Sequence, residues 1–257
     1  MTWRFLNSGA GPGKLNMEID EGLALALLRD EGFPSIRVYG WKPWTLSLGW
    51  NQSPEDVLLD RAEADGIDVV RRPTGGRAVL HANELTYAVV MKADGKNVRE
   101  VHRMISEGLL CAVQRLGVEA AMEERGSGLP GGAFRSGACF VAAARSEIVV
   151  AGRKLVGSAQ RRYGAPGRES VVLQHGSLLL GDDHIRIVDY LRMPGGTRDA
   201  LRRELRRRST NLSAELGRRV TFEEAAAAVK EGFEKAWDVR LGFVAIVSEL
   251  EHETTAN

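Results

Sequence analysis

The turn between two short predicted strands reads Arg71-Arg72-Pro73-Thr74-Gly75-Gly76-Arg77-Ala78-Val79-Leu80-His81. Two adjacent glycines let the backbone come close to a ligand and turn its N–H groups outward. The three arginines add charge-assisted donors for carbonyl or phosphate oxygens, so the turn suits an activated acyl group. A basic β-turn with a purely structural role is an equally weighted alternative, and the spacing of a phosphate-binding P-loop is absent.

On both sides of this turn, the pattern of apolar residues predicts short strands and amphipathic helices. Strands are expected at residues 3–7, 36–39, 45–50, 68–71, 78–80, 85–91, 147–150, 154–160 and 171–180. Helices are expected at residues 17–28, 54–66, 101–116, 198–212 and 225–237. Strands with helices between them and at the end predict an α+β fold, with a mixed β-sheet and packed helices.

Size and composition favour one globular domain. The chain has 257 residues, of which 44% are hydrophobic and 27% charged, so it can bury a core without metals or disulfides. We expect a single domain over residues 1–257, with a mainly helical C-terminal portion from about residue 183. The formal net charge is +1. This charge provides no global field to attract nucleic acid or a membrane, so neither is expected as a partner.

The two cysteines, Cys111 and Cys139, occur in different contexts and are interpreted as free thiols, which favours a reducing compartment. The first residues lack the features of a secretion signal, and no window approaches a membrane span. We therefore expect a cytoplasmic protein, with no metal and no cofactor. Cys111 lies on the amphipathic helix predicted at 101–116, where it is expected to face inward as a small buried residue.

Cys139 ends a glycine-rich loop that begins at Arg125 and contains five glycines and Pro130. Long loops of this kind are usually functional or mobile. A nucleophilic cysteine needs partial exposure and positive surroundings that favour the thiolate, and a loop position near Arg135 provides both. Read alone, however, a single loop cysteine is more often incidental than catalytic.

The strand predicted after the Ala151-Gly152 turn has one face formed by Lys154, Val156, Ser158 and Gln160. Lys154 then points into a site, although a lone hairpin lysine is more often exposed on the surface. The adjoining small residues Gly157, Ser158 and Ala159 leave space for a ligand against this strand. This segment is therefore either a ligand site or an ordinary surface hairpin.

Polar residues interrupt the last predicted strand at Gln174-His175-Gly176-Ser177. Buried polar groups need partners, so this strand is expected to carry hydrogen bonds at its centre. His175 is either a proton shuttle or a hydrogen-bonded structural residue. The arginine-rich run at 202–208 lacks interleaved aromatic residues, and it is interpreted as a solvated helix face rather than a nucleic-acid site.

Three segments together resemble the biotin/lipoate A/B protein ligase family: residues 71–81, Gly152-Arg153-Lys154-Leu155-Val156-Gly157-Ser158-Ala159-Gln160, and Gln174-His175-Gly176-Ser177-Leu178-Leu179. The resemblance runs from about Trp3 to the helix after Thr221. It implies the catalytic fold of the lipoate ligases, a mixed sheet with packed helices that is related to biotin ligases and class II synthetases. Within the family, the stretch from Ser136 to Phe140 looks most like the cysteine-dependent octanoyl-carrier-protein:protein N-octanoyltransferases.

That resemblance implies roles for particular residues. Cys139 matches the acyl-bearing cysteine, and Lys154 matches the lysine beside the reacting carbonyl. The substrate-binding positions that it implies, with those proposed above, are Arg71, Arg72, Thr74, Gly75, Gly76, Arg77, His81, Gly157, Ser158, Ala159 and His175.

The implied reaction moves octanoyl from acyl carrier protein, through a cysteine thioester, to a lysine of the glycine cleavage H protein or of a dehydrogenase lipoyl domain. An ATP-dependent lipoate ligase is a rival interpretation. It is weakened because only about three dozen residues follow Thr221, where such ligases usually carry a further domain. An amidotransferase that acts between lipoyl domains is a second rival, and a non-catalytic acyl-binding protein is a third.

Overall fold

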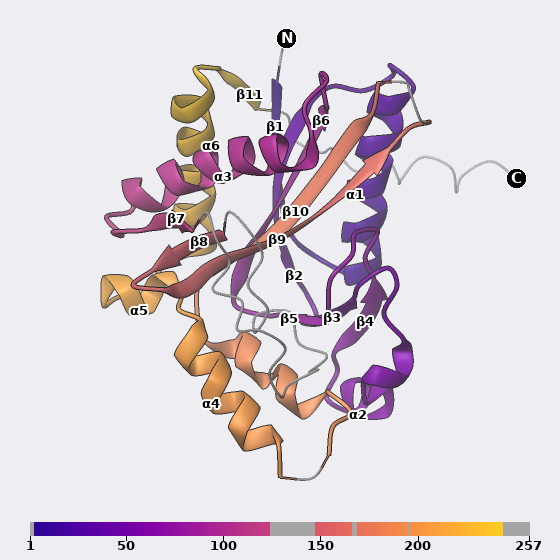
Figure 1. The fold of residues 1–257 in the computed structure, drawn as a ribbon, viewed down its shortest axis with the longest axis vertical. Coiled ribbons are helices and arrows are strands. Elements are labelled where there is room, and N and C mark those ends of the chain that lie inside the picture. The colour runs from indigo at the N-terminus through magenta and orange to yellow at the C-terminus, as the bar shows by residue number, and fades with distance from the viewer. Residues whose placement is uncertain (1–2, 124–146, 166–168, 195, 244–257) are drawn as a thin grey trace, which may run out of the picture.

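The computed structural model describes residues 3–123, 147–165, 169–194 and 196–243, and its main feature is a mixed eight-stranded sheet within those residues (Figure 1). From one edge to the other, its strands are β11 (Leu241–Phe243), β1 (Trp3–Gly11), β2 (Ser35–Trp41), β6 (Glu84–Lys92), β10 (Val171–Leu179), β9 (Arg153–Tyr163), β8 (Glu147–Val150) and β7 (Ala121–Glu123). β11, β1 and β2 are parallel, and the pairs from β2 to β7 are antiparallel. The α+β prediction is confirmed.

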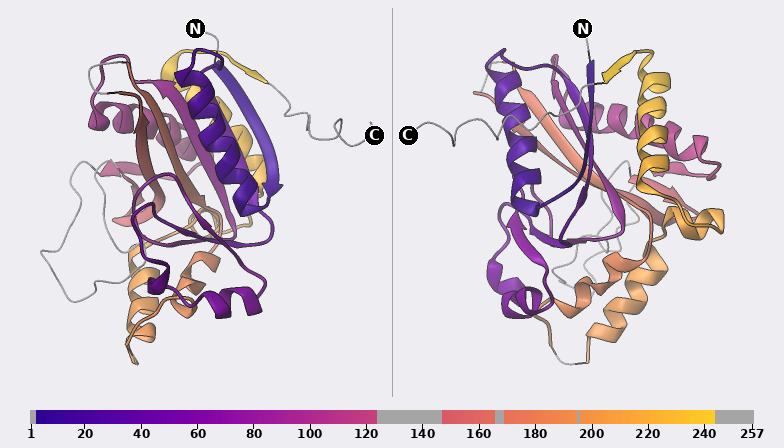
Figure 2. Two further views of the ribbon diagram at one scale, coloured as in Figure 1. Left: turned by 90° about the vertical axis from the view of Figure 1, so that its right-hand side faces the viewer. Right: turned by 180° about the vertical axis from the view of Figure 1, so that it is seen from behind.

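Helices cover both faces of this sheet. The helices α3 (Val98–Arg115) and α6 (Phe222–Trp237) lie on one face, and α1 (Gly13–Leu28) lies on the other (Figure 2). The central strand β6 contributes side chains to the cores on both faces of the sheet. Tyr87 and Val89 belong to the core beneath α3 and α6, whereas Ala88 and Val90 belong to the core beneath α1. Successive strand residues point to opposite faces, so a strand covered on both sides is apolar throughout.

The two helices on the first face cross at close range. A Cβ atom added at Gly232 would lie 2.5 Å from the backbone nitrogen of Ala112, and one added at Gly108 would lie 2.4 Å from the Phe233 ring. A side chain at either position would therefore push α3 and α6 apart. This close packing fixes α3 against the sheet and so determines which of its residues face β9.

A second sheet holds the glycine turn. It contains β4 (Asp68–Arg71), β3 (Thr45–Leu48) and β5 (Val79–His81), with β3 in the middle. Its core is shared with the 3₁₀ helix η3 (Asp183–Asp189) and with α4 (Arg198–Arg208). The turn at 71–81 joins β4 to β5, so this small sheet supports the turn beside the large one.

One predicted helix is interrupted and another is cut short, because residues within the predicted spans pair with distant segments. The helix predicted at 54–66 is divided into η1 (Pro54–Asp56) and α2 (Leu59–Ala64). Between them, Val57 is extended and bridges Leu191, and the Leu58 amide donates to the Tyr190 carbonyl at 2.8 Å. The helix predicted at 198–212 likewise ends at Arg208.

After Arg208, the chain turns away to meet β9. Ser209 is extended and bridges Lys154, and the Thr210 amide donates to the Lys154 carbonyl at 2.9 Å. A further short helix, α5 (Leu212–Leu216), then begins with Asn211 as its cap. These contacts between distant segments could not be anticipated from local periodicity.

The predicted hairpin after residue 147 is confirmed. β8 and β9 are joined by Ala151 and Gly152, which both have positive φ angles, of 47° and 73°. That geometry matches the right-handed twist of the flanking strands. Cys111 is only half-buried, so its predicted inward orientation is met in part. Among the helices that the structure describes, none is long and apolar enough to cross a membrane.

Candidate active site

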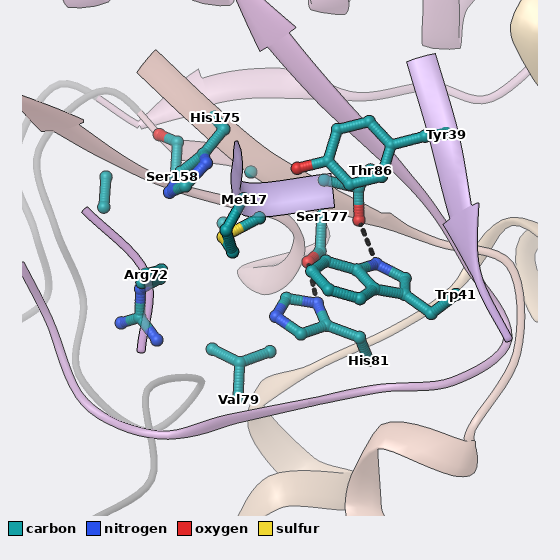
Figure 3. Close-up of a pocket in the computed structure, with 13 residues that line it drawn as sticks. Met17, Tyr39, Trp41, Arg72, Val79, His81, Thr86, Ser158, His175 and Ser177 are labelled. Atoms are coloured by element: carbon teal, nitrogen blue, oxygen red, sulfur yellow. Dashed lines mark hydrogen bonds between the residues drawn. The ribbon is translucent and has the colours of Figure 1, made fainter. Parts of the chain in front are cut away.

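A pocket lies where the two sheets and α1 meet, and it encloses about 440 Å³ of unfilled space, part of it open to solvent (Figure 3). Each of the three motifs contributes to its wall: His81 from the first, Gly157, Ser158 and Ala159 from the second, and His175 from the third. Strand pairing explains this convergence, since His175 stands opposite Ala159 and Ser177 stands opposite Gly157 in the β9–β10 ladder. The motifs are therefore one site.

Four further residues complete the apolar part of the wall. They are Met17 from α1, Tyr39 and Trp41 from β2, and Val79 from β5. The Trp41 ring stacks on His81, with ring centroids 4.1 Å apart and planes 15° from parallel. Aromatic and apolar residues in strands and helices are normally core residues, so the sequence held no signal that Met17, Tyr39 and Trp41 face a pocket. Val79 belongs to the segment 71–81 that the sequence did single out.

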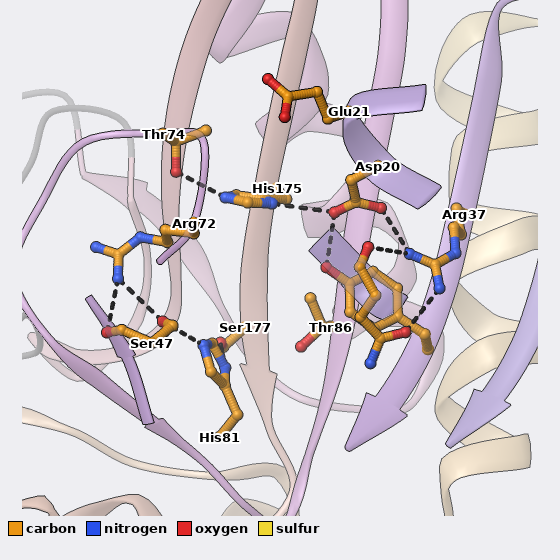
Figure 4. A network of polar contacts seen from close by, with 12 residues as sticks. Asp20, Glu21, Arg37, Ser47, Arg72, Thr74, His81, Thr86, His175 and Ser177 are labelled. Atoms are coloured by element: carbon orange, nitrogen blue, oxygen red, sulfur yellow. Dashed lines mark hydrogen bonds and ion pairs between the residues drawn. The ribbon is translucent and has the colours of Figure 1, made fainter. Parts of the chain in front are cut away.

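A buried carboxylate, Asp20, is the centre of a polar network beside the pocket (Figure 4). It accepts hydrogen bonds from Arg37 at 2.7 Å, from the Tyr39 hydroxyl at 2.7 Å and from His175 Nδ1 at 3.1 Å. Burial alone would raise the pKa of Asp20, but the His175 hydrogen bond and the Arg37 charge lower it. Sequence reasoning missed Asp20, although an acid on the apolar helix 17–28 was a possible signal.

His175 connects this network to the glycine turn. Its Nε2 lies 2.6 Å from the Thr74 hydroxyl. Burial lowers the pKa of His175, even though Asp20 opposes the shift, so the imidazole is neutral at neutral pH. The ionised Asp20 can only accept, which places the ring proton on Nδ1 and makes Nε2 the acceptor of the Thr74 hydroxyl proton. Thr74 and His175, both predicted substrate-binding residues, are therefore in contact. Hydrogen bonds to Thr74 and Asp20 hold the His175 ring on both sides.

A second chain of hydrogen bonds runs through His81. Its Nδ1 lies 2.8 Å from Glu84 Oε1, and its Nε2 lies 2.7 Å from the Ser47 hydroxyl. Glu84 Oε1 also accepts from Ser177 at 2.7 Å. Burial would raise the pKa of Glu84, but His81 and the hydroxyl donors lower it. His81 is therefore oriented between a carboxylate and a hydroxyl, with its face against Trp41.

The arginines of the turn contact the protein's own carbonyl groups. The Arg71 guanidinium donates to the carbonyls of Gly49, Trp50 and Gln52 at 2.8–2.9 Å. Arg72 lines the pocket, and its guanidinium donates to the carbonyls of Ser47, Gly75 and Arg77. Both guanidinium groups therefore support the turn. Their expected role toward a substrate stays a prediction, as do the roles of Gly75, Gly76 and Arg77, which lie outside the pocket lining.

Lys154 is buried, with 6% of its surface exposed, so the interpretation of an exposed hairpin lysine is wrong. Its Nζ donates to Glu147 Oε1 at 2.5 Å, and that carboxylate is buried as well. The segment after α4 covers this part of β9, which is why a hairpin residue is enclosed. Lys154 lies outside the pocket lining. Cys139 lies outside the residues that the structure describes.

The neutral buried histidines lead to a prediction about acid stability. We expect the free energy of unfolding to fall as the pH drops below the ordinary histidine pKa of about 6.5. Burial lowers the pKa of His175 and of His184 in the folded protein, so the unfolded chain binds protons that the native state excludes. Each histidine contributes a slope of at most about 1.4 kcal/mol per pH unit.

Urea unfolding at about pH 7.5 and about pH 5.5 measures this effect. His184 bonds Ser209 at 2.9 Å and lies outside the pocket lining, so His184→Gln should reduce the loss of stability on acidification without removing it. A midpoint that does not change between these pH values would contradict the prediction.

Known protein families and individual proteins resemble this chain in sequence. The family model described as the lipoyl protein ligase A/B catalytic domain matches residues 12–234. The chain is 43% identical over 246 residues to an octanoyltransferase LipM from Symbiobacterium thermophilum, covering 93% of this chain and 88% of the relative. It is 37% identical over 251 residues to an octanoyltransferase LipM from Bacillus subtilis, with the same two coverages.

Solved structures share the fold. A bipartite lipoate protein ligase from Thermoplasma acidophilum, described with its E2 lipoyl domain, superposes with a TM-score of 0.75 at 23% identity, covering 96% of this chain and 88% of that one. A lipoate-protein ligase A bound with ATP superposes with a TM-score of 0.72 at 22% identity, covering 96% of this chain and 90% of that one. The predicted ligase-type fold is thereby confirmed.

Proposed function

This chain belongs to the lipoyl protein ligase A/B catalytic domain family, and on that premise we propose that it is an octanoyltransferase of lipoate biosynthesis. The observation that carries the proposal is the convergence of the three family motifs on one pocket, through His81, Ala159 and His175. Relatives named octanoyltransferase share 37–43% of its sequence over most of its length, whereas the two superposed ligases share 22–23%. Octanoyl transfer is therefore favoured over ligation.

The pocket suits an acyl chain. Its wall is apolar where it is formed by Met17, Tyr39, Trp41 and Val79. The polar atoms of Tyr39 and Trp41 already donate hydrogen bonds within the protein, to Asp20 and Thr86. Burial of a methylene group is worth about 0.8 kcal/mol, so an eight-carbon chain gains on the order of 5 kcal/mol. One methylene more or less changes the affinity only modestly, so chain length is selected by where the pocket ends.

The proposed reaction is two successive acyl transfers. The Cys139 thiolate attacks the thioester of octanoyl acyl carrier protein, and the carrier thiol leaves. The acceptor's lysine amine then attacks the new thioester, which forms the amide and regenerates the Cys139 thiol. The donor is already activated and the amide is more stable than the thioester, so the reaction needs no ATP. The sequence resemblance around Cys139 supports its role as acyl carrier.

Lys154 and the glycine turn are assigned to charge stabilisation. An ammonium group beside the reacting carbonyl stabilises the negative charge that develops on its oxygen, and it also favours a nearby thiolate. Backbone N–H groups at Gly75 and Gly76 add neutral donors for the same oxygen. The buried ion pair between Lys154 and Glu147 supports this assignment because it holds Nζ in a fixed position.

The proposed acceptor is the glycine cleavage H protein or a dehydrogenase lipoyl domain. A structural relative described with an E2 lipoyl domain supports an acceptor of this type. We further propose a cytoplasmic location, because the reaction needs the carrier protein and the acceptor in one compartment. A single catalytic domain over residues 1–257 stays our expectation, and the family match to residues 12–234 supports it.

The decisive experiment supplies purified protein with octanoyl acyl carrier protein and a lipoyl-domain acceptor, without ATP. Mass spectrometry of the acceptor should show an octanoyl group on its lysine. Product that requires ATP and free octanoate would instead identify a ligase. Product formed only from an octanoylated lipoyl domain would identify an amidotransferase. If no donor gave product, the protein would be identified as a non-catalytic acyl-binding protein.

A further inference from the structure

An arginine just beyond the second motif joins the large sheet to the glycine turn. Arg161 follows Gln160 on β9, and strand alternation places its side chain on the same face as Ala159, which lines the pocket. Its Nη1 atom donates a hydrogen bond to the Pro73 carbonyl at 3.1 Å and lies 3.8 Å from the Glu21 carboxylate of α1. Arg161 therefore connects β9 and α1 to the turn that the small sheet supports.

Trp50, in the segment after β3, holds the Arg161 guanidinium and contacts the same turn. The guanidinium carbon lies 4.5 Å from the centre of the Trp50 ring and 4.8 Å from that of the Tyr163 ring, within the range of cation–π attraction. The Trp50 backbone N–H donates to the Thr74 carbonyl at 2.9 Å. The consecutive carbonyls of Pro73 and Thr74 are therefore each held by one member of the Arg161–Trp50 pair.

The remaining contacts leave the turn with paired carbonyls and unpaired N–H groups. The Arg72 guanidinium donates to the carbonyls of Gly75 at 2.9 Å and of Arg77 at 2.7 Å. Within the residues that the structure describes, the N–H groups of Gly75 and Gly76 donate no hydrogen bond, and both glycines are exposed. Consecutive unpaired N–H groups in a turn form a site that favours a negatively charged oxygen.

We propose that Arg161 is a positioning residue, which holds the glycine turn so that the N–H groups of Gly75 and Gly76 stabilise the oxygen of the reacting thioester. This inference rests on the proposed function and deepens it. Both acyl transfers pass through an intermediate in which that oxygen carries negative charge, so both depend on the turn. Donors of this kind act only when they are held in place, and a displacement of about 1 Å can lower the rate about 10²-fold.

Docking of a protein substrate is the alternative role for the Arg161–Trp50 pair, since Trp50 is 51% exposed. The contacts of Arg161 favour positioning, because its guanidinium is engaged by a carbonyl, a carboxylate and two rings of the protein itself. The two roles also differ in their kinetics. A docking residue changes the KM for a protein substrate, whereas a positioning residue changes the maximal rate with every nucleophile.

The test compares two nucleophiles in Arg161→Met, which removes the donor to Pro73. The protein is loaded to completion from octanoyl acyl carrier protein. Release of the octanoyl group is then timed with a lipoyl-domain acceptor and with hydroxylamine, a small nucleophile that needs no docking surface. We expect the maximal rates of both releases to fall by the same factor, about 10²-fold, while the KM values for carrier and acceptor stay near those of the wild type.

Arg162→Met is the matched control. Arg162 is the next residue on β9, its side chain lies on the opposite face, and it donates to the Lys96 carbonyl at 2.7 Å. This variant should release the octanoyl group at the wild-type rate with both nucleophiles. Arg161→Lys retains a donor and should recover part of the rate lost in Arg161→Met. It also carries the test if the methionine variant does not fold, with a smaller but equal fall for both nucleophiles.

Three results would overturn the inference: slower release with the lipoyl domain alone, which identifies a docking role, unchanged release from Arg161→Met, or an equal loss in Arg162→Met. Wild-type protein that takes up no octanoyl group would instead overturn the proposed function itself. The two failures are therefore distinguishable.

Discussion

Replacing Cys139 with serine is expected to abolish formation of the octanoyl-enzyme and to lower octanoyl transfer by on the order of 10³-fold or more. The reaction begins with a thiolate, which forms readily from a thiol near neutral pH, whereas a serine hydroxyl needs a strong base to become a nucleophile. Mass spectrometry of the intact protein after exposure to octanoyl acyl carrier protein measures the adduct. Quantifying the octanoylated acceptor measures the transfer.

Cys111→Ser is the matched control. It removes the other of the two thiols in the sequence, which is half-buried on α3. This variant should load the octanoyl group and transfer it like the wild type. An octanoyl adduct that persists in Cys139→Ser would contradict the assignment of Cys139 as the acyl carrier. Loss of the adduct only in Cys111→Ser would move the acyl carrier to α3.

Replacing Lys154 with methionine is expected to lower kcat by about 10²–10³-fold, the cost of removing one charge-stabilising donor from an oxyanion site. It is also expected to destabilise the fold by about 3–5 kcal/mol, because it leaves the Glu147 carboxylate buried without its ion-pair partner. Both side chains are almost fully enclosed, so solvent screening reduces this penalty little. Steady-state kinetics and urea unfolding measure the two effects.

A double variant separates these effects. Lys154→Met combined with Glu147→Leu removes both charges, and replacing a buried ion pair with apolar residues of similar size is often neutral for stability. The double variant should therefore regain most of the stability and none of the activity. Activity that returns together with stability would show that Lys154 serves the fold and not the chemistry.

Local sequence was sufficient for most of the secondary structure. The hairpin at 147–160 was predictable because Ala151 and Gly152 supply the left-handed conformation of its turn. The helix after Thr221 was predictable because Thr221 and Glu224 have the spacing of an N-terminal helix cap. The helices predicted at 54–66 and 198–212 were too long, because Val57 and Ser209 leave the helical conformation to pair with distant segments. Such pairing leaves no trace in local periodicity.

The candidate site was only partly predictable for the same reason. Its motif residues His81, Ser158 and His175 were found because their segments carry unusual glycine and polar patterns. Trp41 and Asp20 were missed because an aromatic residue in a strand and a single acid in a helix have many ordinary roles. Their position at the pocket follows from packing, which sequence spacing does not describe.

The sequence by itself determined the kinds of chemistry that this protein carries: a glycine turn rich in donors, a lysine on a strand of small residues, and a strand with a polar centre. Only the tertiary structure decided which groups act on one another. Asp20 and His175 are 155 residues apart and hydrogen-bonded, and Lys154 is buried in an ion pair with Glu147 rather than solvated. These contacts depend on the register of paired strands and on exclusion of water. Both arise when the whole chain packs, because the pairing and burial of a charge depend on residues that are distant in sequence.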